Sequence, residues 1–213
     1  HIINLSLGGG YNDGIIQNAI DYAYDNGVIV IAAAGNDNMD ISSHKQSPVC
    51  NDGLTNKVIG VASLQTDYTR SYFSNYSADY VDVSSVGSDV YSTIPEDDYS
   101  SKSGTSMACP VVSGLAGLLL SVSPDLSIQE LQYLLSETAI NIDMENPLYT
   151  GLLGSGAVDA YTSLLSVPQA GDPIARIDTV NVEAGTIIGT VKLDDLDNYS
   201  ISIYPLGKPE ESS

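Results

Sequence analysis

A serine at the start of a long apolar run, Ser106, is the residue best placed to do chemistry. The stretch around it reads Ser-Gly-Thr-Ser-Met-Ala-Cys-Pro over residues 103–110, and the apolar residues 111–120 are typical of a buried helix. Small neighbours let a substrate backbone approach, and the first turn of a helix offers N–H groups to a developing oxyanion. The same pattern also fits an ordinary capped core helix, because serine and threonine are common helix caps. Ser106 is therefore a candidate nucleophile whose role depends on the residues around it.

Two upstream stretches carry further candidates. Residues 4–9 read Asn-Leu-Ser-Leu-Gly-Gly, and residues 32–36 read Ala-Ala-Ala-Gly-Asn, ending at Asn36. The amide of Asn36 could donate to an oxyanion, or could form a simple Asx turn as the chain leaves a strand. Gly8, Gly9 and Gly10 favour a loop where a ligand can approach the backbone. A phosphate cradle is a weak alternative, because there is neither the G-x-G-x-x-G spacing nor a nearby lysine.

The elements that must position these residues form an α/β pattern. A strand over residues 2–7, a helix over 14–26 capped by Asp13, and an apolar strand over 28–34 make one β-α-β unit. In open parallel sheets, chemistry collects at the carboxyl ends of the strands. On the helix we expect Ile15, Ile16, Ala19, Ile20 and Ala23 to share one face.

Later residues continue the same alternation. The pattern predicts strands over residues 57–64, 80–84 and 90–93, followed by the helix that begins near Ser106. Ser127 and Glu130 form a capping box for a helix over 128–138, and a short helix is predicted over 158–165.

Together the three stretches resemble the subtilisin-like serine proteases, the subtilases. The matching motifs are Ser6-Leu7-Gly8-Gly9, Ala33-Ala34-Gly35-Asn36 and Gly104-Thr105-Ser106-Met107-Ala108-Cys109-Pro110, and residues 58–62, 73–76 and 154–160 add support. The resemblance covers about residues 2–165. It implies a three-layer subtilisin-like fold, with a parallel sheet flanked by helices, that is incomplete at its amino-terminal side.

The resemblance also implies a role for individual residues. Ser106 would be the nucleophile that forms an acyl-enzyme, and Asn36 would donate its side-chain amide to the oxyanion beside the Ser106 N–H. Thr105 would add a weaker hydroxyl contact to the same oxyanion. The first upstream stretch would pair with an extended substrate, and the second would line a pocket with room for a large apolar side chain. The implied substrate-binding residues are Ser6, Leu7, Gly8, Ala33, Ala34, Gly35 and Thr105.

The base and the carboxylate of a catalytic triad are not found in the family's setting. The chain has two histidines, His1 and His44, and neither stands in the His-Gly-Thr motif of the family. In subtilases the aspartate and the histidine come from the amino-terminal half of the domain. A chain that begins inside a strand is also expected to be a piece of a longer protein. We therefore interpret residues 1–166 as the carboxyl-terminal half of a catalytic domain whose missing amino-terminal half is its partner.

Composition limits the other partners. The 213 residues carry a formal net charge of −20, which repels nucleic acid and anionic membranes. No stretch reaches the roughly 18 consecutive apolar residues of a membrane span, so none is expected. Cys50 and Cys109 are predicted to be free, inert thiols. The resemblance implies a secreted or cell-surface protein.

The last part of the chain changes in character. Residues 167–175 read as a linker, residues 176–206 as the start of a β-rich accessory region of two to four strands, and residues 207–213 as a disordered tail. Residues 194–198 gather carboxylates but lack an EF-hand pattern, which favours an acidic turn. Calcium binding is implied by the resemblance alone, no metal ligands are assigned, and no His/Cys cluster predicts a zinc site.

The sequence thus predicts a serine endopeptidase that acts on polypeptides through Ser106 and Asn36 and is inactive as an isolated fragment. The alternative is a non-catalytic subtilase-like scaffold or adhesion module, motivated by the same missing base. A carbohydrate-binding surface module is a third hypothesis, which depends only on the alternating tail and the 14 tyrosines.

Overall fold

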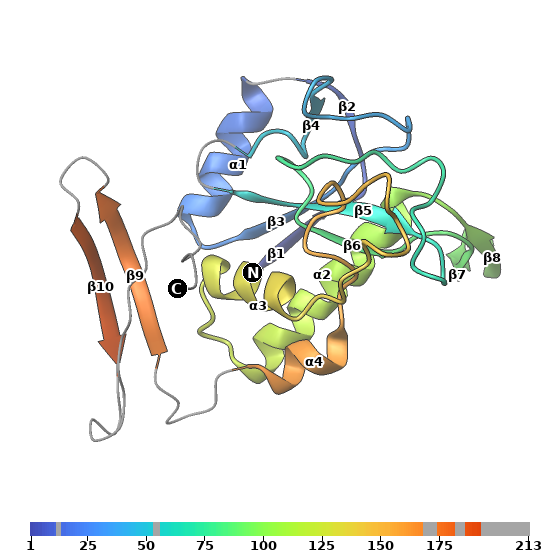
Figure 1. The fold of residues 1–213 in the computed structure, drawn as a ribbon. Coiled ribbons are helices and arrows are strands. Elements are labelled where there is room, and N and C mark those ends of the chain that lie inside the picture. The colour runs from blue at the N-terminus through green and yellow to red at the C-terminus, as the bar shows by residue number, and fades with distance from the viewer. Residues whose placement is uncertain (12–13, 53–55, 168–173, 182–185, 193–213) are drawn as a thin grey trace, which may run out of the picture. The chain divides into compact units, whose positions relative to one another are not determined.

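A parallel sheet of four strands forms the centre of the first unit of the chain (Figure 1). The computed structural model describes residues 1–11, 14–52, 56–167, 174–181 and 186–192. Backbone contacts divide the chain into two units, His1–Val167 and Pro168–Ser213. The sheet order is β1-β3-β5-β6, and its members are β1 (Ile2–Leu5), β3 (Ile29–Ala33), β5 (Val58–Leu64) and β6 (Val83–Val86).

The two central strands are buried along their whole length. Each residue of β3 and of β5 is buried, as their continuous apolar sequences predict for strands covered on both faces. β3 pairs in parallel with β1 on one side and with β5 on the other. The predicted strands over 28–34 and 57–64 are therefore confirmed, and both direct their carboxyl ends to the same edge of the sheet.

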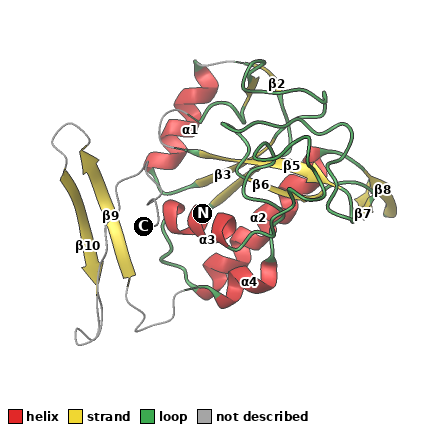
Figure 2. Ribbon diagram, viewed as in Figure 1, coloured by secondary structure: helices red, strands yellow, loops and turns green. Residues whose placement is uncertain are grey.

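Helices cover both faces of the sheet (Figure 2). Alternate side chains of β3 divide between the faces: Ile31 packs with the cluster that includes α2, and Val30 packs with the cluster that includes α1. The chain therefore has the three-layer α/β fold expected of it. The helices are α1 (Ile15–Asp25) on one face and α2 (Thr105–Val122), α3 (Ile128–Glu137) and α4 (Ala160–Leu165) on the other.

Helix α2 is apolar on more than one face. Within the described residues it is the one helix long and apolar enough to meet the length and composition of a membrane span. Seven of its residues are buried, and it packs across all four strands of the sheet. Val111, Leu118 and Val122 nevertheless lie exposed on it. The outer strand β1 similarly leaves Ile3 40% exposed. The molecule thus carries apolar surface on α2 and on its open sheet edge.

Several local predictions hold and others need correction. Ser127 and Glu130 form the predicted capping box of α3, because each side chain bonds to the other's backbone N–H. On α1, Ile15 is 81% exposed and Ala19 is also exposed, so the apolar face is narrower than predicted. Asp13 lies outside the described residues. The strand expected at 80–84 begins instead at Val83, and β7 (Val90–Ile94) pairs with a strand that was not predicted, β8 (Asp98–Lys102).

The second unit contains an antiparallel pair of strands, β9 (Ile174–Asn181) and β10 (Thr186–Lys192). The predicted linker is wrong at both ends, because Val167 is buried in the core of the first unit and β9 already begins at Ile174. The predicted strands beyond Lys192, the acidic turn at 194–198 and the tail at 207–213 lie outside the described residues.

Two carboxylates lie close to the start of β5, of which Asp52 is buried and Asp82 is half-buried. Asp52 Oδ1 accepts a hydrogen bond from the Val58 N–H at 2.8 Å, and Asp82 Oδ2 accepts one from the Gly60 N–H at 2.7 Å. Burial raises the pKa of Asp52 to about 6, and the nearby Asp82 adds to this increase. Burial likewise raises the pKa of Asp82. Ionised Asp52 is therefore less stable in the folded chain than in the unfolded chain.

This raised pKa predicts that Asp52 lowers stability as the pH rises. Between about pH 4 and pH 6 the folded chain binds more protons at this site than the unfolded chain, so the free energy of unfolding falls across that window. Replacing Asp52 with asparagine keeps an acceptor for Val58 and should stabilise the chain by about 1–3 kcal/mol at pH 8. The gain should vanish near pH 4. Thermal unfolding at both pH values measures this difference.

A matched control separates this effect from the general loss of one negative charge. Asp125 is exposed in the turn between α2 and α3. Asp125→Asn should leave the unfolding temperature nearly unchanged at either pH. A gain from Asp52→Asn that was equal at pH 4 and pH 8 would show that the Asp52 carboxylate is not responsible.

Candidate active site

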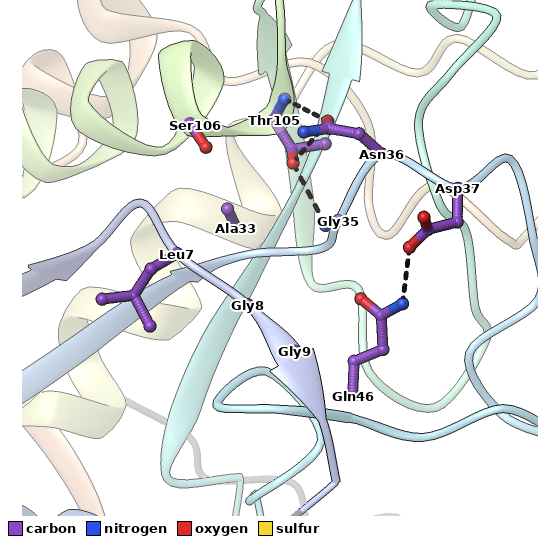
Figure 3. A pocket seen from close by; sticks show the side chains of 10 residues that line it. All are labelled: Leu7, Gly8, Gly9, Ala33, Gly35, Asn36, Asp37, Gln46, Thr105 and Ser106. Carbon is purple, nitrogen blue, oxygen red and sulfur yellow. Dashed lines mark hydrogen bonds between the residues drawn. The ribbon is translucent and has the colours of Figure 1, made fainter.

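A cavity of about 330 Å³ lies where the carboxyl ends of β1 and β3 meet the amino-terminal end of α2 (Figure 3). Residues from all three stretches singled out in the sequence contribute to it, although they are far apart along the chain. Its lining consists of Leu7, Gly8, Gly9, Ala33, Gly35, Asn36, Asp37, Gln46, Thr105 and Ser106.

Ser106 lies in the first turn of α2, one residue after Thr105. Its Oγ donates to the carbonyl oxygen of Ser6 at 3.0 Å, and the Ser6 hydroxyl donates to the Ser106 carbonyl at 2.8 Å. The residue that caps α2 is Gly104. Ser106 therefore is not the helix cap, and its hydroxyl lies in the cavity against the end of β1.

The side chain of Asn36 is held by long-range contacts. Its Oδ1 accepts hydrogen bonds from the Thr105 N–H at 2.8 Å and from the Thr105 hydroxyl at 2.9 Å. Because these two hydrogen bonds fix the position of Oδ1, the other end of the amide, Nδ2, points toward Ser106 (Figure 3). These contacts join residues 69 positions apart, so the side chain does not form the local Asx turn that was the alternative.

The side-chain amide of Asn36 and the backbone N–H of Ser106 lie close to one another beside Gly104. A Cβ built on Gly104 would lie 3.5 Å from Asn36 Nδ2 and 3.7 Å from the Ser106 backbone nitrogen. Both donors therefore border the same small volume, which the absence of a side chain at Gly104 leaves open. N–H groups in the first turn of a helix have no partner inside the helix, and they are suited to stabilising negative charge.

Thr105 has a different role from the one expected. Its hydroxyl accepts a hydrogen bond from the Gly35 N–H at 3.1 Å and gives its single proton to Asn36 Oδ1. No proton remains for a direct contact with an oxyanion. The expectation that Thr105 touches the oxyanion is therefore corrected: Thr105 fixes the orientation of the Asn36 amide instead.

The remaining predicted binding residues divide into two groups. Leu7, Gly8, Ala33 and Gly35 line the cavity as expected. Ala34 does not, because alternate residues at the end of a strand point to opposite faces and Ala34 is buried in the cluster beneath α1. Ser6 contributes its carbonyl oxygen to Ser106 rather than forming part of the cavity lining.

Two polar residues of the lining, Asp37 and Gln46, were missed by the sequence reasoning. Gln46 belongs to β4 (Gln46–Ser47), which pairs with β2 (Gly9–Gly10) and so brings a polar loop back to the cavity. Its Nε2 donates to Asp37 Oδ2 at 2.6 Å. Gly35 has φ of +100°, and a Cβ there would lie 2.4 Å from Gln46 Oε1. No sequence motif signals this approach, because it depends on the pairing of two very short strands.

Neither histidine lines the cavity. His44 is exposed, and its Nδ1 lies 3.1 Å from the hydroxyl of the adjacent Ser43. His1 is exposed at the start of β1. Among the described residues, the hydroxyl of Ser106 therefore has no imidazole partner.

Metal and thiol chemistry also lie outside this site. The described residues contain no group of three or more His, Cys, Asp or Glu side chains that could hold a metal ion. Cys50 and Cys109 are both free and buried. Both cysteines are free, as predicted, and burial raises the pKa of the Cys50 thiol and raises that of Cys109 to about 11, which disfavours the reactive thiolate.

Comparison with known proteins supports one family. The sequence model of the subtilase family, peptidase S8, matches residues 1–171. Subtilisin DY of Bacillus licheniformis is 40% identical over 141 residues, which are 66% of this chain and 50% of that protein. The halolysin-like extracellular serine protease Nep of Natrialba magadii is 42% identical over 171 residues, which are 80% of this chain and 29% of that protein.

A solved structure agrees with these sequence matches. A protease from Pseudoalteromonas arctica PAMC 21717 superposes with a TM-score of 0.67 at 32% identity, covering 78% of this chain and 51% of that one. The chain spans half of the length of subtilisin DY and less than a third of Nep.

Proposed function

Because the chain belongs to the subtilase family, we propose that it is the nucleophile-bearing part of a serine endopeptidase. The observation that carries this proposal is the shared space beside Gly104, bordered by Asn36 Nδ2 and the Ser106 N–H. Two preorganised donors beside a serine hydroxyl can stabilise the tetrahedral intermediate of acyl transfer. No cofactor is needed for this chemistry.

The proposed reaction begins with attack of Ser106 Oγ on the carbonyl carbon of a peptide bond. A histidine base takes the hydroxyl proton, and the carbonyl oxygen becomes an oxyanion that accepts hydrogen bonds from Asn36 Nδ2 and the Ser106 N–H. Collapse of this intermediate breaks the C–N bond, and the amine leaves with the proton from the histidine. Water then hydrolyses the ester by the same route and restores the serine.

An extended polypeptide is the substrate class that the cavity suits. Residues 6–8 lie between β1 and β2, outside any strand pairing in the described structure, and Leu7 is 60% exposed. We propose that the backbone of Leu7 and Gly8 pairs with a substrate strand that runs past Ser106, whereas the Ser6 carbonyl accepts the hydrogen bond from the Ser106 hydroxyl. The scissile bond would then lie over Ser106 with the preceding side chain in the cavity.

The base and its carboxylate are proposed to come from another part of the same catalytic domain. The exposed edge of β1 and the exposed Val111, Leu118 and Val122 of α2 are apolar surfaces that such a part would cover. In the structure the Ser106 hydroxyl donates a hydrogen bond to the Ser6 carbonyl, which is too weak a base to deprotonate it at neutral pH. We use the term assembled protease for the chain combined with this missing part.

A fluorophosphonate probe tests the proposal, because it phosphonylates only serines activated by a base. The isolated chain should label no faster than the Ser106→Ala variant. The assembled protease should label with one equivalent, and peptide mapping should place the adduct on Ser106. Rapid labelling of the isolated chain, or an adduct on another serine, would contradict the assignment.

Gly104 provides a more detailed test of the oxyanion geometry. Gly104→Ala would place a methyl group at ordinary contact distance from Asn36 Nδ2 and the Ser106 nitrogen, and the backbone there is extended, with φ of 160°. The fold should tolerate the change within about 0.5 kcal/mol, whereas the labelling rate of the assembled protease should fall about 10- to 100-fold. An unchanged labelling rate would show that the oxyanion does not occupy this space.

A non-catalytic scaffold or adhesion module is the second candidate, favoured by the absence of an imidazole beside Ser106 in the described residues. The coding sequence upstream of His1 discriminates between the two. An aspartate and a histidine in the family's motifs would support the enzyme, and substitution of either would support the scaffold. We favour the enzyme, since a scaffold has no need for an oriented Asn36 amide, and we propose that it acts outside the cell or at its surface.

A further inference from the structure

The segment that carries Asn36 is held by a buried side chain that lies outside the cavity. Asn75 is 0% exposed and belongs to the loop between β5 and β6, and it is not among the residues that line the cavity. Four hydrogen bonds join Asn75 to the segment from Ala34 to Met39, which follows β3. This segment includes Asn36, the proposed donor to the oxyanion.

The Asn75 side chain bonds to backbone groups on both sides of Asn36. Its Nδ2 donates to the Ala34 carbonyl oxygen at 2.9 Å. Its Oδ1 accepts hydrogen bonds from the N–H groups of Asp37 at 3.0 Å and of Met39 at 3.1 Å. One carboxamide therefore supplies the hydrogen bonds that a helix or a strand would otherwise give to these backbone groups, and it fixes the chain before and after Asn36.

Gly35 allows Asn75 to approach this closely. The Asn75 N–H donates to the Gly35 carbonyl oxygen at 3.0 Å, and a Cβ built on Gly35 would lie 2.4 Å from Asn75 Nδ2. Gly35 also has φ of +100°, a backbone conformation that other residues rarely adopt. Asn75 is therefore packed directly against the residue that precedes Asn36.

Two fixed points determine the direction of the Asn36 amide. Asn75 fixes the backbone from which the Asn36 side chain extends, and Thr105 fixes its Oδ1 through two hydrogen bonds. With both ends held, Nδ2 has one position, beside the Ser106 N–H. Donors stabilise an oxyanion most when they are oriented before the reaction, so a loss of orientation raises the barrier even when every donor is still present.

We propose that Asn75 is a positioning residue that acts on catalysis through Asn36. The proposal depends on the proposed function, because it concerns stabilisation of the oxyanion. Asn75 does not line the cavity, so its replacement should lower kcat without weakening the binding of substrate.

Steady-state kinetics of the assembled protease test this proposal. Asn75→Ala should lower kcat about 10- to 30-fold and should leave KM within about twofold of the natural value. In an Asn36→Leu background the same substitution should lower kcat by less than about twofold further, because the donor that it positions is already absent. An equal loss of kcat with and without Asn36 would overturn the proposal, as would full activity of Asn75→Ala.

Asn146→Ala is the matched control for a general loss of stability. Asn146 is 5% exposed, and its Oδ1 accepts a hydrogen bond from the Arg70 N–H. Its Nδ2 donates to the carbonyl oxygens of Tyr68 and Ile142, and none of these residues lines the cavity. Asn75→Ala and Asn146→Ala should each lower the unfolding temperature by about 5–10 °C, but Asn146→Ala should keep the natural kcat. A similar loss of kcat in Asn146→Ala would assign the effect to general destabilisation and overturn the proposal.

Nuclear magnetic resonance of the isolated 213-residue chain tests the positioning without catalysis. Nitrogen relaxation of the Asn36 side-chain amide should give an order parameter of about 0.85 in the natural chain and in Asn146→Ala, and below about 0.6 in Asn75→Ala. A mobile amide in the natural chain, or an unchanged order parameter in Asn75→Ala, would overturn the proposal. Failure of the natural assembled protease to cleave any peptide would contradict the proposed function but would leave these order parameters unchanged.

Discussion

Replacement of Ser106 with alanine is expected to lower kcat of the assembled protease about a million-fold, the loss that subtilisin, a member of the same family, shows without its serine. The reason is that no other hydroxyl in the described cavity lies between Asn36 Nδ2 and the end of β1. KM should change little, because the substrate backbone and the preceding side chain keep their contacts. The fold should lose only the hydrogen bond to the Ser6 carbonyl, about 1 kcal/mol.

Ser113→Ala is the matched control for Ser106→Ala. Ser113 lies two turns further along α2, and its hydroxyl likewise bonds to the β1 side of the molecule, at Asn4 Oδ1 2.9 Å away. Its loss should therefore have a similar effect on stability and none on kcat. Steady-state hydrolysis and phosphonate titration of both variants measure the difference. If Ser106→Ala kept more than about 1% of the activity, the nucleophile would have to be sought elsewhere.

Replacement of Asn36 is expected to have the second largest effect. Asn36→Leu should lower kcat about 100- to 1,000-fold with little change in KM, which is the cost measured in subtilisin for the loss of its oxyanion asparagine. The donor acts only when the carbonyl oxygen becomes an oxyanion, so its removal raises the barrier without weakening substrate binding. Single-turnover kinetics of the assembled protease measure this loss at the acylation step.

Two further variants separate donation by Asn36 from its structural contacts. Asn36→Asp keeps an acceptor for the Thr105 N–H and hydroxyl but has no proton to donate, so it should be at least as slow as Asn36→Leu while unfolding at a similar temperature. Thr105→Val keeps the amide but removes the hydroxyl that orients it, and should cost only about tenfold. Activity in Asn36→Asp close to the natural level would rule out donation by the amide.

Much of the fold follows from local patterns. The apolar runs of β3 and β5 predict strands covered on both faces, and Ser127 with Glu130 predicts where α3 begins. These features can be predicted from the sequence because each depends on residues within one turn or one strand. Predictions that required knowledge of the neighbouring element were less accurate: Ile15, which the pattern placed on the apolar face of its helix, is 81% exposed.

The candidate site likewise combines features that the sequence predicts with features that only the structure reveals. The sequence by itself determined that Ser106 begins a buried helix, that Asn36 ends a buried strand, and that the resemblance to subtilases joins the two. Only the tertiary structure decided that the Thr105 proton goes to Asn36, that Ala34 faces away, and that Asp37 and Gln46 close the cavity. Residue types report burial and local backbone preference, whereas the direction of a single proton or the return of a polar loop depends on strand pairings and hydrogen bonds between residues far apart in the chain.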